Sequence, residues 1–141
     1  MILSQKCQYA LRAIYEITRR QGEWPVKSGD IARAMAIPPR FLENILAQLK
    51  QGGFIESKRG KEGGYMLADP DRDLTVGEII RFIQGPLAPV HCMTEGWAGK
   101  CPLAENCPFH SMWERAQQAL VEVYDQTTFR DLVREHAEGH T

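Results

Sequence analysis

Three of the chain's four cysteines and two of its four histidines are concentrated in one short segment, HCMTEGWAGKCPLAENCPFH. Within this segment the spacing C-x8-C-x5-C-x2-H is formed by Cys92, Cys101, Cys107 and His110. Three thiolates and one imidazole make a complete set of four ligands, which suits either a tetrahedral zinc ion or an iron-sulfur cluster. The spacing therefore predicts a metal site in this part of the chain.

The residues themselves leave more than one chemistry open. A structural zinc would be redox-silent, and the spacing is similar to the CCCH zinc-finger pattern with one residue fewer in the last gap. A thiol enzyme or redox carrier that uses Cys101 and Cys107 is a third alternative. Because the sequence has no C-x-x-C pair and no motif that places a catalytic base, we expect a binding protein rather than an enzyme.

Length and composition are consistent with one domain in a reducing compartment. The 141 residues are 43% hydrophobic, which is enough apolar material to bury a core. The apolar runs are far shorter than a membrane span, and charged residues interrupt the N-terminal segment, so we expect a cytoplasmic protein with no membrane contact. Thiols stay reduced in the cytoplasm, where clustered cysteines bind metal or act in redox chemistry more often than they form disulfides.

The net charge of −1 hides an asymmetry between the two parts of the chain. Residues 1–67 contain eleven Lys or Arg and six Asp or Glu, a formal charge of +5, whereas the remaining residues carry −6. The basic part is the candidate for contact with a polyanion. On charge alone, a chance difference between two solvated surfaces explains the asymmetry equally well.

The spacing of apolar residues predicts a mainly α-helical fold with a small β-hairpin. A capping box at Thr75 and Glu78 predicts the start of one helix. We expect helices over about 4–20, from Ser28 or Lys27 to Met35, from Pro39 to Gly52, from Thr75 to Gly85, from about Ser111 to Asp125, and from Thr127 or Thr128 onward.

The two short helices before Gly52, joined by a tight turn, predict a helix-turn-helix. The second helix places polar and exposed side chains on one side, where they are candidate readers of DNA bases: Arg40, Phe41, Glu43, Asn44 and Gln48. Arginine pairs with guanine, asparagine or glutamine with adenine, and glutamate with cytosine. Taken alone, this helix is better explained as an ordinary solvated surface.

The segment that follows, FIESKRGKEGGYML, favours DNA binding over an ordinary solvated surface. It has β-prone residues at both ends of a glycine-rich turn, which predicts a hairpin with a basic tip, the wing of a winged helix-turn-helix. Contacts to the phosphate backbone or the minor groove are expected from Lys58, Arg59, Gly60 and Lys61. We therefore expect a DNA-binding region at 1–70 and a cysteine-loop and dimerisation region at 71–141, within one compact unit.

Over nearly its full length the chain resembles the Rrf2 family of bacterial winged-helix regulators, and within it the IscR and NsrR iron-sulfur type. The resemblance is carried by LSQKCQYALRA, by IPPRFLENILAQLKQGGFIESKRGKEGGYML, by LTVGEII, and by the three cysteines that lead into HSMW. It implies a DNA-binding transcription regulator that acts as a repressor. Its binding to the operator would respond to the state of an iron-sulfur cluster, so the protein would sense redox conditions.

The resemblance also implies roles for particular residues. Glu43 and its neighbours would read bases of a pseudo-palindromic operator in double-stranded DNA, and Arg59 would lie in the minor groove. The three loop cysteines would ligate iron. His110 would be the fourth ligand of a [2Fe-2S] cluster, because the alternative position, Gln8, holds a neutral and poor ligand. A homodimer would be built by the long helix that contains Met112, Trp113, Ala116 and Leu120.

The spacing between Cys92 and Cys101 is longer than in the IscR-like branch. A [4Fe-4S] cluster is therefore an alternative to [2Fe-2S]. Zinc is the alternative metal. With zinc, the protein would be a winged-helix DNA-binding protein that holds a structural ion in its Cys3His loop.

Overall fold

The computed structural model describes residues 1–94, 96–97, 99 and 101–139. Most of its regular structure is helical, with one antiparallel hairpin, which confirms the predicted fold class. In chain order the elements are α1 (Gln5–Arg19), α2 (Ser28–Met35), α3 (Pro39–Gln51), β1 (Ile55–Lys58), β2 (Gly64–Leu67), α4 (Val76–Ile83), the short 3-10 helix η1 (His91–Met93), α5 (His110–Gln126) and α6 (Phe129–Ala137).

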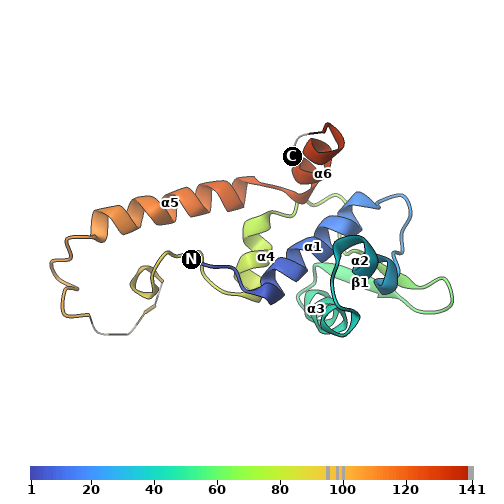
Figure 1. The fold of residues 1–141 in the computed structure, drawn as a ribbon, viewed down its shortest axis with the longest axis horizontal. Coiled ribbons are helices and arrows are strands. Elements are labelled where there is room, and N and C mark those ends of the chain that lie inside the picture. The colour runs from blue at the N-terminus through green and yellow to red at the C-terminus, as the bar shows by residue number, and fades with distance from the viewer. Residues whose placement is uncertain (95, 98, 100, 140–141) are drawn as a thin grey trace.

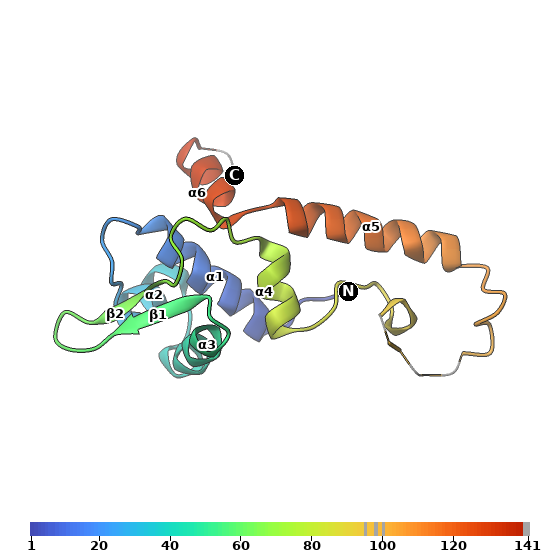
Figure 2. The ribbon, with the colours of Figure 1, turned by 180° about the vertical axis from the view of Figure 1, so that it is seen from behind.

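Helix α5 projects from a body formed by α1 to α4, the hairpin and α6 (Figure 1). The same arrangement is seen from behind in Figure 2. In both views the tip of the hairpin and the segment that joins η1 to α5 lie at opposite ends of the long axis of the molecule. The basic tip of the hairpin and the residues just before α5 are therefore far apart in the folded chain.

Helix α1 lies at the centre of the body, where it contacts α2, α3, α4, α6 and β2. The side chain of Ser4 caps its start by accepting a hydrogen bond from the Cys7 amide. Its inner stripe is fully buried and includes Cys7, Ala10, Ala13, Ile14 and Ile17. Burial raises the pKa of the Cys7 thiol, and this cysteine packs as a small buried hydrophobe.

The turn between α2 and α3 depends on a left-handed residue. Ala36 has φ 53° and ψ 50°, and its amide donates to the carbonyl of Ala32, which closes α2. Pro39 then occupies the first turn of α3, where its missing amide hydrogen costs nothing. The predicted apolar stripe of α3 is buried and consists of Leu42, Ile45, Leu46 and Leu49. These features form the predicted helix-turn-helix.

The hairpin is attached to the body along one edge. Ile55 pairs with Leu67 and Lys58 with Gly64 across the two strands. On the outer edge of β2, Tyr65 exchanges two backbone hydrogen bonds of 2.8 Å with Val26. A Cβ atom on Gly64 would lie 2.5 Å from the Val26 carbonyl oxygen, so glycine is needed for this close approach. The segment before α2 therefore holds the wing in place.

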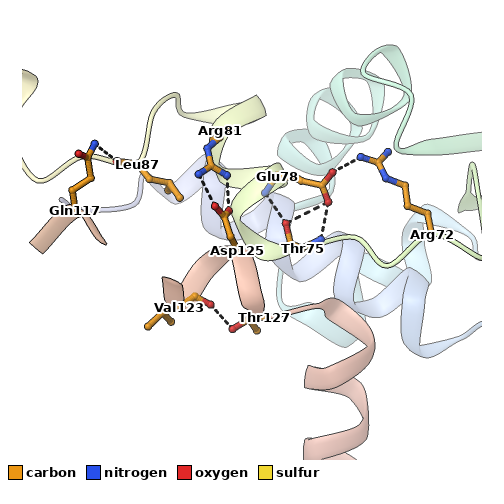
Figure 3. Close-up of polar contacts among 9 residues, drawn as sticks. All are labelled: Arg72, Thr75, Glu78, Arg81, Leu87, Gln117, Val123, Asp125 and Thr127. Carbon is orange, nitrogen blue, oxygen red and sulfur yellow. Dashed lines mark hydrogen bonds and ion pairs between the residues drawn. The ribbon is translucent and has the colours of Figure 1, made fainter. Parts of the chain in front are cut away.

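Helices α4 and α6 begin at a shared junction. Each starts with a capping box, Thr75 with Glu78 and Thr128 with Asp131, and the first of these is drawn in Figure 3. Two backbone hydrogen bonds connect the starts: the Val76 amide donates to the Thr127 carbonyl, and the Phe129 amide donates to the Leu74 carbonyl. The end of α5 is thus fastened to the body.

A second contact at this junction is the ion pair between Arg81 of α4 and Asp125 of α5 (Figure 3). The two guanidinium nitrogens lie 2.5 and 2.8 Å from the carboxylate oxygens. The pair passes close over Gly77, where an added Cβ atom would lie 1.9 Å from the carboxylate. The hydrogen bonds from Arg81 lower the pKa of Asp125 and raise that of Arg81.

We expect Asp125→Asn to lower the free energy of unfolding at pH 7, by less than about 1 kcal/mol because the pair is partly exposed. A carboxyl group whose pKa is lowered by folding stabilises the protein above its unfolded pKa, about 3.9, and loses that effect in acid. The difference from wild type, measured by urea unfolding, should therefore shrink as the pH falls below about 4. Glu122→Asn, which alters an exposed carboxylate on the same helix, is the control, and an equal effect of both changes would contradict the assignment.

Candidate functional site

The outer surface of α3 presents most of the predicted base-reading side chains to solvent. Arg40, Phe41, Glu43 and Asn44 are exposed, and Phe41 keeps 46% of its accessible surface. Gln48 differs from the other four because it is half-buried, and its side-chain oxygen is buried without a hydrogen-bond partner. Four of the five residues are therefore free to contact a ligand, and the fifth is turned partly inward.

The start of α1 lies beside this surface and was missed by the sequence prediction. Tyr9 packs against Phe41 with 6.5 Å between ring centroids, and the Arg40 guanidinium lies 5.0 Å from the Phe41 ring. Gln5 and Lys6 border the same hollow of about 420 Å³ as Phe41 and Asn44. The lysine in the basic part of the chain was the only available signal, because its position beside α3 depends on how the two helices pack.

The wing tip carries its charges in the open. Lys58, Arg59, Gly60 and Lys61 are all exposed. Gly60 has φ 108°, a conformation that favours glycine, and its carbonyl accepts a 2.9 Å hydrogen bond from the Gly63 amide, which closes the turn. Glu62 is exposed in the same turn, but among the described residues no ion pair joins these two lysines and this arginine to an acidic side chain.

A hollow of about 570 Å³ separates the wing from the start of α2. Four cations line it, Lys27 and Arg33 from the α2 region and Lys58 and Lys61 from the wing. The acidic residue on its border, Asp30, is paired with Arg33. Lys27 and Arg33 were not predicted as site residues. They lie in the basic part of the sequence, but about thirty residues separate them from the wing that they adjoin.

The four cysteines are free thiols, of which Cys92 and Cys101 are exposed and Cys107 is half-buried. Cys92 lies in η1 and shares a hollow of about 720 Å³ with His110, the first residue of α5. Cys101 and Cys107 are not among the residues that border this hollow. Of the four predicted ligands, Cys92 and His110 therefore border one open hollow, and Cys101 and Cys107 do not border it.

The imidazole of His110 has a protein partner, since its Nε2 atom lies 2.6 Å from a carboxylate oxygen of Glu114. Within the described part of the chain, no three His, Cys, Asp or Glu side chains are grouped closely enough to hold a metal ion. The ligand set of Cys92, Cys101, Cys107 and His110 stays a prediction.

A helix-turn-helix followed by a basic hairpin defines a winged-helix DNA-binding protein. The sequence model of the Rrf2 family, described as "Iron-dependent Transcriptional regulator", matches residues 3–135. The chain belongs to the Rrf2 family of DNA-binding transcriptional regulators.

Individual relatives agree with this assignment. The transcriptional regulator CymR of Bacillus subtilis is 32% identical over 132 residues, which cover 94% of this chain and 89% of CymR. The solved structure of CymR, described as the global cysteine regulator of B. subtilis, has a TM-score of 0.76 at 31% identity and covers 95% of this chain and 97% of its own. The structure of IscR from T. potens also has a TM-score of 0.76, at 28% identity, and covers 100% and 92%.

These findings confirm the predicted family, the winged helix-turn-helix fold and the assignment to regulators rather than enzymes. Among the helices of the described residues, none has the length and apolar character that a membrane crossing requires.

Proposed function

We propose that this regulator is a homodimeric repressor whose affinity for a pseudo-palindromic operator depends on an iron-sulfur cluster in the loop from His91 to His110. The observation that carries the proposal is the position of this loop. Three free thiols precede α5 and His110 is its first residue, and none of the 17 residues of this helix is buried. Such a helix needs another surface to cover its apolar side. The loop is joined directly to its first turn.

The reading of DNA is assigned to α3 and the wing. The exposed surface of α3 offers Arg40, Glu43 and Asn44 to base edges in the major groove. Arg59 at the wing tip would enter the minor groove, while Lys58 and Lys61 would neutralise phosphates. The four cations around the hollow between wing and α2 add a surface of matching charge for the DNA backbone.

The homodimer is assigned to an apolar stripe along α5. Met112, Ala116, Ala119 and Val123 follow each other at spacings of four, three and four residues, the pattern of a helix–helix seam. Met112 and Val123 are 42% and 60% exposed, and Ala119 is exposed as well. Trp113 and Leu120, which were also predicted at the interface, are half-buried beside the stripe.

This stripe is self-complementary in an antiparallel pair. Two copies of α5 related by a two-fold axis would place Met112 opposite Val123 of the other copy and Ala116 opposite Ala119. The alanines in the middle permit close approach of the two helices. A two-fold dimer presents two copies of α3, which match operator half-sites about 34 Å apart.

The donor set fits an iron-sulfur cluster by its chemistry. Thiolate sulfur from Cys92, Cys101 and Cys107 and the nitrogen of His110 are ligands that such clusters accept, with [2Fe-2S] preferred and [4Fe-4S] as the alternative. When bound, a cluster would supply iron atoms that can change their oxidation state and whose presence depends on the supply of iron. The family description as iron-dependent and the similarity to an IscR support the same assignment.

The described backbone does not oppose closure of the loop. Its hydrogen bonds beyond Thr94 are local turns, such as those from the Ala104 amide to Cys101 and from the Asn106 amide to Leu103. Among the described residues of the loop, Cys101 and Cys107 have no backbone hydrogen bond to the body that closure would break. Closure would act on the start of α5, and through it on the seam that sets the spacing of the two DNA-reading heads. A difference of about 1.4 kcal/mol between the two loop states changes operator affinity tenfold.

We expect Glu43→Ala to relax the preference for one base pair of the operator, because a lost carboxylate contact affects one position. Arg59→Ala should weaken binding to all operator sequences by about 1 to 3 kcal/mol. Fluorescence anisotropy with the operator and with single-base variants of it distinguishes the two effects. Normal affinity and selectivity in both variants would place the reading surface elsewhere.

For the dimer, we expect Ala119→Glu to raise the dissociation constant about a hundredfold or more, because it buries an unpaired carboxylate in the seam at a cost of about 3 kcal/mol. Gln118→Glu adds the same charge to the neighbouring exposed position outside the stripe and is the matched control. Sedimentation equilibrium measures the mass of both. A dimer that survives Ala119→Glu would exclude this face of α5.

For the cluster, protein purified without air should be brown and contain iron with matching acid-labile sulfide, and Cys107→Ser should lose both. Operator affinity of the loaded and iron-free forms should differ by at least tenfold. Colourless protein with one zinc per chain would keep the DNA-binding assignment and overturn the sensing mechanism. Equal affinity of the two forms would also contradict it.

A further inference from the structure

Gln117 of α5 is the residue that connects this helix to the segment carrying Cys92. Its side-chain Nε2 donates to two carbonyl oxygens, those of Leu87 and Met93, each at 3.1 Å. Figure 3 shows the bond to Leu87. One side-chain amide therefore fastens the segment from Leu87 to Met93 to the side of α5, and each of the two amide hydrogens has an acceptor.

The two carbonyls lie at opposite ends of the segment that contains Cys92. Leu87 is 3% exposed and belongs to the core, so the segment leaves the body at a fixed point. Met93 follows Cys92 directly and ends η1, which is closed by hydrogen bonds from the Met93 amide to Val90 and from the Thr94 amide to His91. With both ends tied to Gln117, the position of Cys92 relative to α5 is defined.

The other two loop cysteines have no comparable attachment among the described residues. The backbone hydrogen bonds around Cys101 and Cys107 join residues three apart, as from the His110 amide to the Cys107 carbonyl. His110, which borders the same hollow as Cys92 and Gln117, is fixed by its place in α5. The loop thus has one attached thiol and two that are held only by local turns.

We propose that Gln117 is a positioning residue that holds the segment carrying Cys92 against α5 before metal is bound. The part of this assignment that concerns metal rests on the proposed function. A ligand that is already in place lowers the conformational entropy lost when the remaining ligands close around a cluster. Because Gln117 lies seven residues after His110, a shift of the segment from Leu87 to Met93 acts directly on the first two turns of the helix.

The experiment compares Gln117→Leu and Gln117→Glu with Gln118→Leu. The first two changes remove the amide donor while keeping a side chain of similar size, and the third alters the neighbouring exposed glutamine of the same helix. Each full-length variant is checked by thermal melting. Two rates are then measured in iron-free protein: hydrogen exchange of the peptide 87–94, and alkylation of Cys92 and Cys101 by iodoacetamide. The third rate is the loss of iron to a chelator after reconstitution with iron and sulfide.

In both Gln117 variants we expect hydrogen exchange at 87–94 to be about tenfold faster or more, because two hydrogen bonds are lost. Cys92 should be alkylated faster while Cys101 is unchanged, and iron should be lost at least tenfold faster. Gln118→Leu should match wild type throughout. Wild-type exchange and alkylation in the Gln117 variants would overturn the assignment, and so would faster exchange with unchanged loss of iron.

The two proposals fail separately. If the wild-type protein takes up no iron, the cluster proposal falls, and the exchange and alkylation rates alone decide whether Gln117 positions Cys92. If wild type holds iron and the Gln117 variants hold it equally well, the cluster proposal stands and the positioning role is wrong.

Discussion

The burial of one face of α1 is the constraint on which the rest of the structure depends. Removal of this stripe from water favours every contact that the helix makes, with the helix-turn-helix and β2 on one side and with α4 and α6 on the other. Cys7, Ala10 and Ala13 are small, so the neighbouring helices can approach closely. The DNA-reading head and the support for α5 are therefore built on the same core, although they belong to different parts of the sequence.

Polar contacts add to the packing of Val121 and Tyr124 against the core in fastening α5 to that body. Its final turn is held by the Arg81–Asp125 pair over Gly77 and by the backbone bridge at Thr127, and its middle is held by the Gln117 amide. Partly exposed ion pairs and hydrogen bonds contribute little stability compared with burial of a side chain.

The sequence by itself determined the local structure, because short-range physics is written in adjacent residues. The period of the apolar positions located the helices, the spacing of Thr75 and Glu78 located a helix start, and the glycines between Lys58 and Tyr65 located the hairpin turn. The exposed surface of α3 follows from the same periodicity, except that Gln48 is turned partly inward by its tertiary surroundings.

Only the tertiary structure decided which distant residues meet. Lys27 and Arg33 join the wing lysines because Val26 pairs with Tyr65, and Cys92 borders the same hollow as His110 because Gln117 binds the chain on both sides of Cys92. The spacing of the four predicted ligands does not reveal that the chain around Cys92 is attached to α5, whereas the chain around Cys101 and Cys107 is held by local turns. These outcomes depend on helix crossing angles and on close approaches to the chain at Gly64, by the Val26 backbone, and at Gly77, by the Asp125 side chain, which no periodicity along the chain encodes.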